Sequence, residues 1–269
     1  WVIKLNAKGQ EIWQKTIGGS TMEKLLSIAP TKDGGYILGG TSSSDASEDL
    51  EKDKYSKNED SRGNLDYWVV KLKSDGTMQW QKTIGGQYQD ELKSIHQTTD
   101  GGYILGGYSN SPISGDKTEA NYGLGDYWIV KLNEEGSMEW QRTLGGDKDD
   151  NLFALSQTKD GGFIVGGNSN SGATNSKSKS NKEGTDFWVL KLDKTGGIDW
   201  QETYNYGKID VLTSIVENPD GSYLIGGYAQ SEAQVKSQKS KVKSLQSDKE
   251  GINDYIALKI NAKGEEIWT

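Results

Sequence analysis

The sequence predicts an all-β protein made of repeated four-stranded units, and three observations lead to this expectation. One short motif recurs five times at nearly constant spacing. The intervals between its copies hold four short apolar runs, with glycine-containing turns between them. No stretch of about 12 or more residues shows the 3.6-residue periodicity of an amphipathic helix.

The recurring motif is an aromatic or aliphatic residue, two further apolar residues, a lysine and a final apolar residue. Its copies are Trp1–Leu5, Trp68–Leu72, Trp128–Leu132, Trp188–Leu192 and Ile256–Ile260. A second tryptophan follows each copy, at Trp13, Trp80, Trp140, Trp200 and Trp268, so the intervals are 67, 60, 60 and 68 residues. Spacing this regular indicates a repeat architecture.

Each repeat contains four predicted strands, which we name A to D. In the second repeat these are Leu92–Gln97, Gly102–Tyr108, Tyr127–Leu132 and Met138–Thr143. Thr99–Gly102 separates A from B, and Asn133–Gly136 separates C from D. Glycine-containing connections of this length favour hairpins, because glycine readily adopts the positive φ of the turn. The unit is therefore predicted to be an antiparallel meander of about 60 residues.

The apolar runs indicate how the units pack. Trp68-Val69-Val70 and Tyr103-Ile104-Leu105 are apolar at consecutive positions, which is typical of strands covered on both faces. In a β-propeller each four-stranded antiparallel blade lies between two neighbours and is covered in this way. Glycine pairs at the end of strand B would allow close approach between blades, at Gly39-Gly40, Gly106-Gly107, Gly166-Gly167 and Gly226-Gly227.

We therefore expect residues 1–269 to form a single β-propeller domain with about four and a half repeats. The predicted complete blades cover approximately 23–84, 90–144, 150–204 and 210–269, and residues 1–18 form an extra C–D pair. The chain begins at Trp1 rather than at a methionine and ends inside a repeat. We expect a longer parent protein to supply the rest of the ring.

The repeated segments resemble a known family. Asp66–Leu72 (Asp-Tyr-Trp-Val-Val-Lys-Leu), Trp80–Gly86 and Asp100–Gly107 are similar to the secreted bacterial β-propeller repeats found in surface proteins of Bacteroidota. The resemblance covers essentially the whole chain. It implies export, an extracellular or cell-surface location and an adhesive or ligand-binding context, with no catalytic motif. Many relatives carry an Asp-Gly-Asp-like segment before Asp-Tyr-Trp. Here only Ser114–Lys117 (Ser-Gly-Asp-Lys) comes close, so a metal-binding role is not carried over to that loop.

Composition excludes several classes of function. The net charge is −8, and no basic face interleaved with aromatic residues is evident, so we expect no nucleic-acid partner. There is no cysteine, which excludes disulfides and thiolate metal sites. No apolar run reaches the roughly 18 residues of a membrane span. His96 is the only histidine, which rules out a histidine-based catalytic triad.

The meander topology identifies a candidate ligand face. The B–C and D–A connections must emerge at one edge, and the B–C loops there are long, polar and different: 41–65, 108–125, 168–185 and 228–253. Variable loops on a rigid scaffold are common binding sites. The D–A connections carry acids at matched positions, namely Glu23, Asp90, Asp150 and Asp210. These carboxylates could attract a cation, with Ca²⁺ favoured by hard oxygen ligands, or could accept hydrogen bonds from loop amides.

Two other recurrent features of these loops have structural interpretations. Asp66, Asp126, Asp186 and Asp254 precede the aromatic residues of strand C and are predicted to fix a turn. The lysine- and serine-rich stretches 176–182 and 236–244 are predicted to be solvated loop tips, with contact to an acidic polymer as the alternative.

The function that we expect is a non-enzymatic, secreted or cell-surface binding or adhesion module for a protein or glycan. No cofactor is expected, and Ca²⁺ is the one alternative considered. One alternative is a propeller domain of a larger quinoprotein-like enzyme, because Gly9–Trp13 resembles the docking motif of such propellers. The repeats are nearly uniform, however, whereas catalysis needs unique polar residues in one place. The other alternative is an inert structural spacer.

Overall fold

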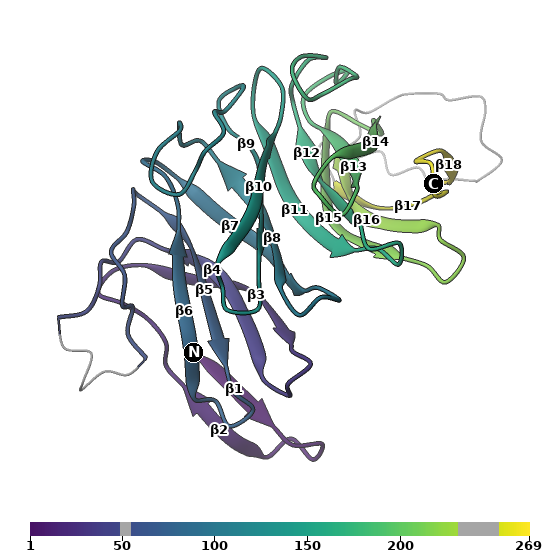
Figure 1. Cartoon of the computed structure of the whole chain (residues 1–269). Coiled ribbons are helices and arrows are strands. Elements are labelled where there is room, and N and C mark those ends of the chain that lie inside the picture. The colour runs from purple at the N-terminus through teal and green to yellow at the C-terminus, as the bar shows by residue number, and fades with distance from the viewer. Residues whose placement is uncertain (49–54, 231–252) are drawn as a thin grey trace.

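A computed structural model describes residues 1–48, 55–230 and 253–269. These residues form eighteen β-strands and no helix (Figure 1). The strands form one two-stranded sheet followed by four four-stranded antiparallel sheets, each a meander of sequential neighbours. The predicted all-β fold and its repeated four-stranded units are thus confirmed. None of the described segments is a helix that could cross a lipid bilayer.

The strand boundaries repeat from sheet to sheet. The two-stranded sheet consists of β1 (Val2–Leu5) and β2 (Glu11–Lys15). Sheet 1 consists of β3 (Glu23–Pro30), β4 (Tyr36–Ser42), β5 (Asp66–Leu72) and β6 (Met78–Ile84). Sheet 2 consists of β7 (Asp90–Gln97), β8 (Tyr103–Ser109), β9 (Asp126–Leu132) and β10 (Met138–Leu144). Sheet 3 consists of β11 (Asp150–Gln157), β12 (Phe163–Ser169), β13 (Asp186–Leu192) and β14 (Ile198–Tyr204). Sheet 4 consists of β15 (Ile209–Glu217), β16 (Tyr223–Gln230), β17 (Asn253–Ile260) and β18 (Glu266–Trp268).

The short turns form as the sequence predicts. In sheet 2, Gly101 and Gly136 have φ values of 92° and 81°, in the region that favours glycine, and they close the A–B and C–D turns. Asp100 helps to fix the A–B turn, because its carboxylate accepts a hydrogen bond of 3.0 Å from the Gly102 amide.

The core lies between successive sheets rather than inside any one of them. All seven residues of β5, β9 and β13 are buried, which confirms that strand C is covered on both faces in sheets 1 to 3. In sheet 4, at the end of the row, residues 253–255 of β17 are exposed. Gly106 of β8 shows how closely the sheets approach. A β-carbon built on it would come within 2.8 Å of the Leu155 side chain and 3.0 Å of that of Leu152, both in the next sheet. The predicted role in close approach between sheets is therefore confirmed for the first glycine of the pairs in sheets 1 to 3. The second glycine of each of these pairs lies instead against the strand-A backbone of its own sheet, as Gly107 does against the Glu91 carbonyl.

Aromatic side chains connect consecutive sheets. The Tyr67 hydroxyl donates a hydrogen bond of 2.9 Å to the carbonyl of buried Trp128 in sheet 2, and the two rings lie 4.9 Å apart. Trp80 is half-buried and lies against Gly136, in the C–D turn of the next repeat, and edge-on to Tyr103. The glycine–tryptophan motif therefore packs one repeat against the next.

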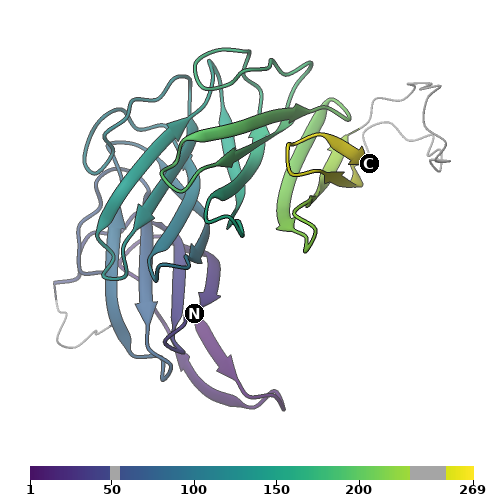
Figure 2. The same ribbon diagram turned by 45° about the vertical axis from the view of Figure 1, so that its right-hand side comes forward.

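The sheets follow one another in a curved row whose two ends do not meet (Figure 2). The described residues thus form an open arrangement rather than a closed ring. At one end, Leu25 and Ile28 of β3 are exposed, because only the pair β1–β2 precedes sheet 1. At the other end, Val216 and Ile267 of sheet 4 are exposed.

Candidate functional site

The structure brings the B–C loops and the D–A connections together at one edge of the row, which we call the long-loop edge. The amide of Asp116, in the loop of sheet 2, donates a 2.8 Å hydrogen bond to the carbonyl of Gly85, in the connection that precedes that sheet. Ser176 makes the equivalent 3.1 Å bond to Gly145 one repeat later. Part of loop 41–65 and nearly all of loop 228–253 lie outside the described residues, as does the whole stretch 236–244.

The matched acids of the D–A connections are on this edge, and three of them are fully buried: Asp90, Asp150 and Asp210. Asp150 accepts hydrogen bonds from the Gly146 amide at 2.7 Å and the Ser171 hydroxyl at 2.8 Å. Asp90 makes the same contacts with Gly86 and Ser111. These carboxylates hold the D–A connection to the B–C loop, which is the second of the two roles that the sequence suggests for them.

The other two matched acids vary this arrangement. Asp210 accepts a 2.7 Å hydrogen bond from the Tyr206 amide. Glu23 is only partly buried, and its longer side chain accepts hydrogen bonds from Ser42 at 3.1 Å and Ser44 at 2.5 Å. Every one of the four acids therefore has partners in its own loops.

A second series of buried aspartates begins strand C. The Asp126 carboxylate accepts a 2.6 Å hydrogen bond from the Tyr122 amide, and the Asp186 carboxylate accepts one of 3.0 Å from the Lys182 amide. The Asp66 carboxylate accepts the equivalent hydrogen bond from the Arg62 backbone amide. The predicted turn-fixing role is confirmed for these three residues, whereas Asp254 is exposed and follows a segment outside the described residues.

Five of these buried carboxylates keep one oxygen, Oδ1, without a hydrogen-bond donor: Asp66, Asp90, Asp126, Asp150 and Asp210. Burial without full hydrogen bonding favours the neutral carboxyl group. Burial accordingly raises the pKa of Asp126 to about 7 and that of Asp210 to about 6. Burial also raises the pKa values of Asp90 and Asp150.

In sheet 3, the aspartate that begins strand C has a hydrogen-bond donor for each of its two carboxylate oxygens. Gly85 and Gly145 lie against Oδ1 of Asp66 and Asp126, and no side chain at these glycines can reach that oxygen. At the matched position of the next repeat, Asn205 donates a 2.7 Å hydrogen bond to Oδ1 of Asp186. Asp186 is the one member of its series in sheets 1 to 3 that has no unpartnered oxygen.

Three buried lysines support the loops: Lys57, Lys117 and Lys177. The Lys117 ammonium donates a 2.5 Å hydrogen bond to Thr143 and lies 5.5 Å from the centre of the Trp128 ring. Lys177 makes the same contacts with Thr203 and Trp188, at 2.8 Å and 5.5 Å. Burial lowers the pKa values of Lys117 and Lys177 to about 8, because desolvation disfavours the ammonium ion.

These lysines correct two sequence predictions. Lys177 is buried, so the stretch 176–182 is not a solvated tip throughout, although Lys179 and Lys182 are exposed. The second prediction is that only Ser114–Lys117 comes close to the family's loop segment. The next loop contains a structural counterpart, because Asn175 has a positive φ of 54° where Gly115 has one of 55°. The sequence contains a usable signal, because each buried lysine lies nine residues before the aspartate that begins strand C.

The exposed side chains on this common framework differ between repeats. In repeat 2 they are apolar or aromatic: Tyr88, Ile113, Tyr122 and Leu124 are 47%, 63%, 47% and 68% exposed. In repeat 3 the positions of Tyr88 and Tyr122 are occupied by exposed Lys148 and Lys182. The framework is therefore constant and its outer surface is variable.

The geometry does not support a single cation held by the matched acids. Among the described residues, no three acidic or histidine side chains gather in a way that could hold a metal ion. Calcium binding at an individual junction stays a prediction.

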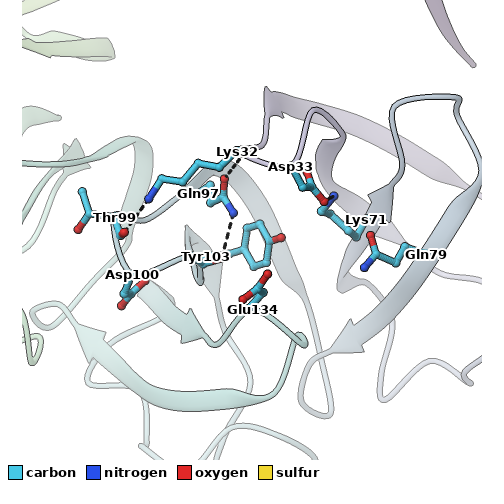
Figure 3. Close-up of a pocket in the computed structure, with 10 residues that line it drawn as sticks. Lys32, Asp33, Lys71, Gln79, Gln97, Thr99, Asp100, Tyr103 and Glu134 are labelled. Atoms are coloured by element: carbon cyan, nitrogen blue, oxygen red, sulfur yellow. Dashed lines mark hydrogen bonds and ion pairs between the residues drawn. The ribbon is translucent and has the colours of Figure 1, made fainter.

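A hollow of about 260 Å³ lies at the opposite edge, where the short turns gather (Figure 3). It opens between sheets 1 and 2, and no motif in the sequence predicts it. Its lining comes from both sheets: Lys32, Asp33, Lys71, Gln79, Gln97, Thr99, Asp100, Gly101, Tyr103 and Glu134. The Lys32 ammonium reaches across the junction and donates a 2.6 Å hydrogen bond to the Thr99 carbonyl.

Comparison with known proteins adds little to this description. The sequence matches no protein-family model, and no curated protein matches it. A protein of unknown function from Bacteroides caccae is similar in structure, with 12% identity, a TM-score of 0.35, and coverage of 97% of this chain and 85% of the other. Sqt1 from Chaetomium thermophilum has 13% identity and a TM-score of 0.39, and the match covers 79% of this chain and 42% of Sqt1. Likeness at this level carries no argument about function.

Proposed function

We propose that this protein is a non-enzymatic binding module that presents variable loops along one edge of a propeller-type repeat array. The observation that carries the proposal is the exposed set Tyr88, Ile113, Tyr122 and Leu124 on the long-loop edge. Several large apolar side chains exposed along one edge of a protein are candidates for an interaction surface. Tyrosine suits such a role because it combines a large apolar surface with a polar hydroxyl group.

The loop framework supports the same proposal. Buried aspartates and lysines fix the backbone of the loops in sheets 2 and 3, so the exposed positions there can change without loss of the loop conformation. A pre-organised loop loses less conformational entropy on binding than a flexible one. Constant anchors beneath variable tips are what a binding scaffold requires.

We further infer that the curved row belongs to a propeller-type ring of the secreted Bacteroidota kind, at the cell surface or outside the cell. The inference is supported by the repeated motifs and by the way each sheet packs face to face on the next. The partner that we propose is a protein or a glycan.

The test is a glycan array together with affinity capture of surface proteins, using the wild-type chain and a Tyr122→Lys variant. Lysine occupies the matched position 182 in repeat 3, so the framework should tolerate this change. Glu135→Thr is the control, because it introduces the repeat-3 residue at an exposed turn on the opposite edge. We expect a ligand that wild type and the control retain and that Tyr122→Lys loses. Failure of wild type to capture any ligand would favour an inert spacer.

A further inference from the structure

A buried lysine of strand C recurs at the short-turn edge, and in two repeats it has three acceptors. The Lys131 ammonium binds the Asp100 carboxylate at 3.1 Å, the Leu132 carbonyl at 3.0 Å and the Glu139 carboxylate at 2.9 Å. Lys191 has the same set, with Asp160 at 2.9 Å, Leu192 at 3.1 Å and Asp199 at 3.5 Å. Since an ammonium group carries three N–H donors, both lysines have one acceptor for each donor.

The corresponding lysine of sheet 1 lacks the third acceptor. Lys71 donates to the Asp33 carboxylate at 2.7 Å and to the Leu72 carbonyl at 3.1 Å. Gln79 occupies the position of Glu139 and Asp199, and no described residue supplies a second carboxylate. The Lys71 side chain is only 3% exposed, so its third N–H has little access to bulk water.

Lys71 and Gln79 both line the hollow between sheets 1 and 2 (Figure 3). In repeats 2 and 3 the third acceptor comes from the side chain at the position of Gln79, so the free N–H of Lys71 is directed toward that side of the hollow. The amide of Gln79 can supply further N–H donors at the same place. Lys32 adds a second ammonium group to the lining.

We propose that this hollow binds the carboxylate group of a ligand, which takes the place of the acidic side chain missing at position 79. The ligand oxygens would accept hydrogen bonds from the Lys71 ammonium and the Gln79 amide, as the Glu139 carboxylate does from Lys131. A single negative charge is favoured over a phosphate dianion, because Asp33, Asp100 and Glu134 also line the hollow and would repel a higher charge.

The size of the hollow narrows the class of ligand. Its volume of about 260 Å³ is below the range of roughly 300–1,000 Å³ that is typical for drug-sized ligands. It therefore suits one carboxylated unit of the size of a sugar acid, either free or as a residue of an acidic polymer. This proposal is independent of the function proposed for the long-loop edge, because the two sites lie at opposite edges.

Calorimetric titration with galacturonate tests the proposal, and galactose serves as the probe that lacks only the carboxylate. We expect wild type to bind galacturonate saturably with a dissociation constant below about 10 mM, and to bind galactose at least tenfold more weakly. Gln79→Glu places a carboxylate beside Lys71, as in repeats 2 and 3, and should weaken galacturonate binding at least tenfold. Gln87→Glu makes the same change of charge at an exposed position on the long-loop edge and should leave binding unchanged.

A tetramer of galacturonate distinguishes the two sources of the carboxylate. If wild type binds the tetramer more tightly than the monomer, and Gln79→Glu loses tetramer binding, the natural ligand is an acidic polymer. Equal affinity for tetramer and monomer indicates a free acid. Thermal unfolding checks that Gln79→Glu is folded. The proposal is overturned if wild type binds no galacturonate in this range, or if Gln79→Glu binds it as well as wild type does.

Discussion

Replacement of Asp126 by asparagine should change how the stability of the protein depends on pH. The Asp126 carboxyl group is buried at the start of β9. Its Oδ2 accepts a hydrogen bond from the Tyr122 amide, and its Oδ1 has no hydrogen-bond donor. Burial raises its pKa from 3.8 to about 7. The Asp150 carboxylate acts in the same direction, and Lys117 acts against it. Asparagine can still accept the Tyr122 hydrogen bond but carries no charge.

The magnitude follows from the pKa difference. A carboxyl whose pKa is higher in the folded state favours folding when it is protonated, and this contribution is lost as the pH rises toward the folded pKa. Between pH 5 and the folded pKa of about 7 the unfolded chain is already ionised, so two pH units at about 1.36 kcal/mol each correspond to a loss of about 3 kcal/mol. Asp126→Asn should remove about this much of the pH dependence.

Urea unfolding at pH 5 and at pH 8 measures the effect. We expect the advantage of Asp126→Asn over wild type, in free energy of unfolding, to be about 3 kcal/mol larger at pH 8 than at pH 5. Glu183→Gln is the matched control, because Glu183 is exposed on the same edge. Parallel pH profiles of wild type and Asp126→Asn would refute the reasoning.

Two further predictions concern packing and calcium. Trp128→Ala should lower the free energy of unfolding by about 3–5 kcal/mol, because the side chain is fully buried, and half-buried Trp80→Ala should cost less. Urea unfolding measures both, and a silent Trp128→Ala would contradict the packing described here. If calcium binds the D–A acids, it should raise the unfolding temperature of wild type but not of the Asp90→Asn/Asp150→Asn double variant. Equal midpoints with calcium and with chelator would leave these acids as loop anchors.

The strands and their order were predictable because the pattern repeats. Each copy of the motif Trp68–Leu72 repeats the same evidence, and the glycines that close the turns stand at fixed offsets. The predicted strand ends differ from those of the structure by only one or two residues, as at Asp90, where strand A begins earlier, and at Gly102, which precedes strand B. Whether the sheets close into a ring depends on small angles between neighbouring sheets, and these angles cannot be predicted from the residue pattern.

The interior of the loops was harder to predict. Lysine is rarely buried, so composition alone predicts a solvated tip for the stretch 176–182, which contains the buried Lys177. The burial of Lys117 depends on a tryptophan face and a threonine hydroxyl from β9 and β10, the two strands that follow its loop. The hollow at the opposite edge combines residues of two repeats, so no single repeat of the sequence contains its lining.

The contact between Trp80 and Gly136 has a consequence for how such a chain can grow. Every junction takes its tryptophan from one repeat and its turn glycine from the next, as Trp140 and Gly196 do again one repeat later. A duplicated unit therefore carries one half of each junction that it will form. Duplication of a whole unit therefore supplies the tryptophan–glycine contact at each new junction between repeats.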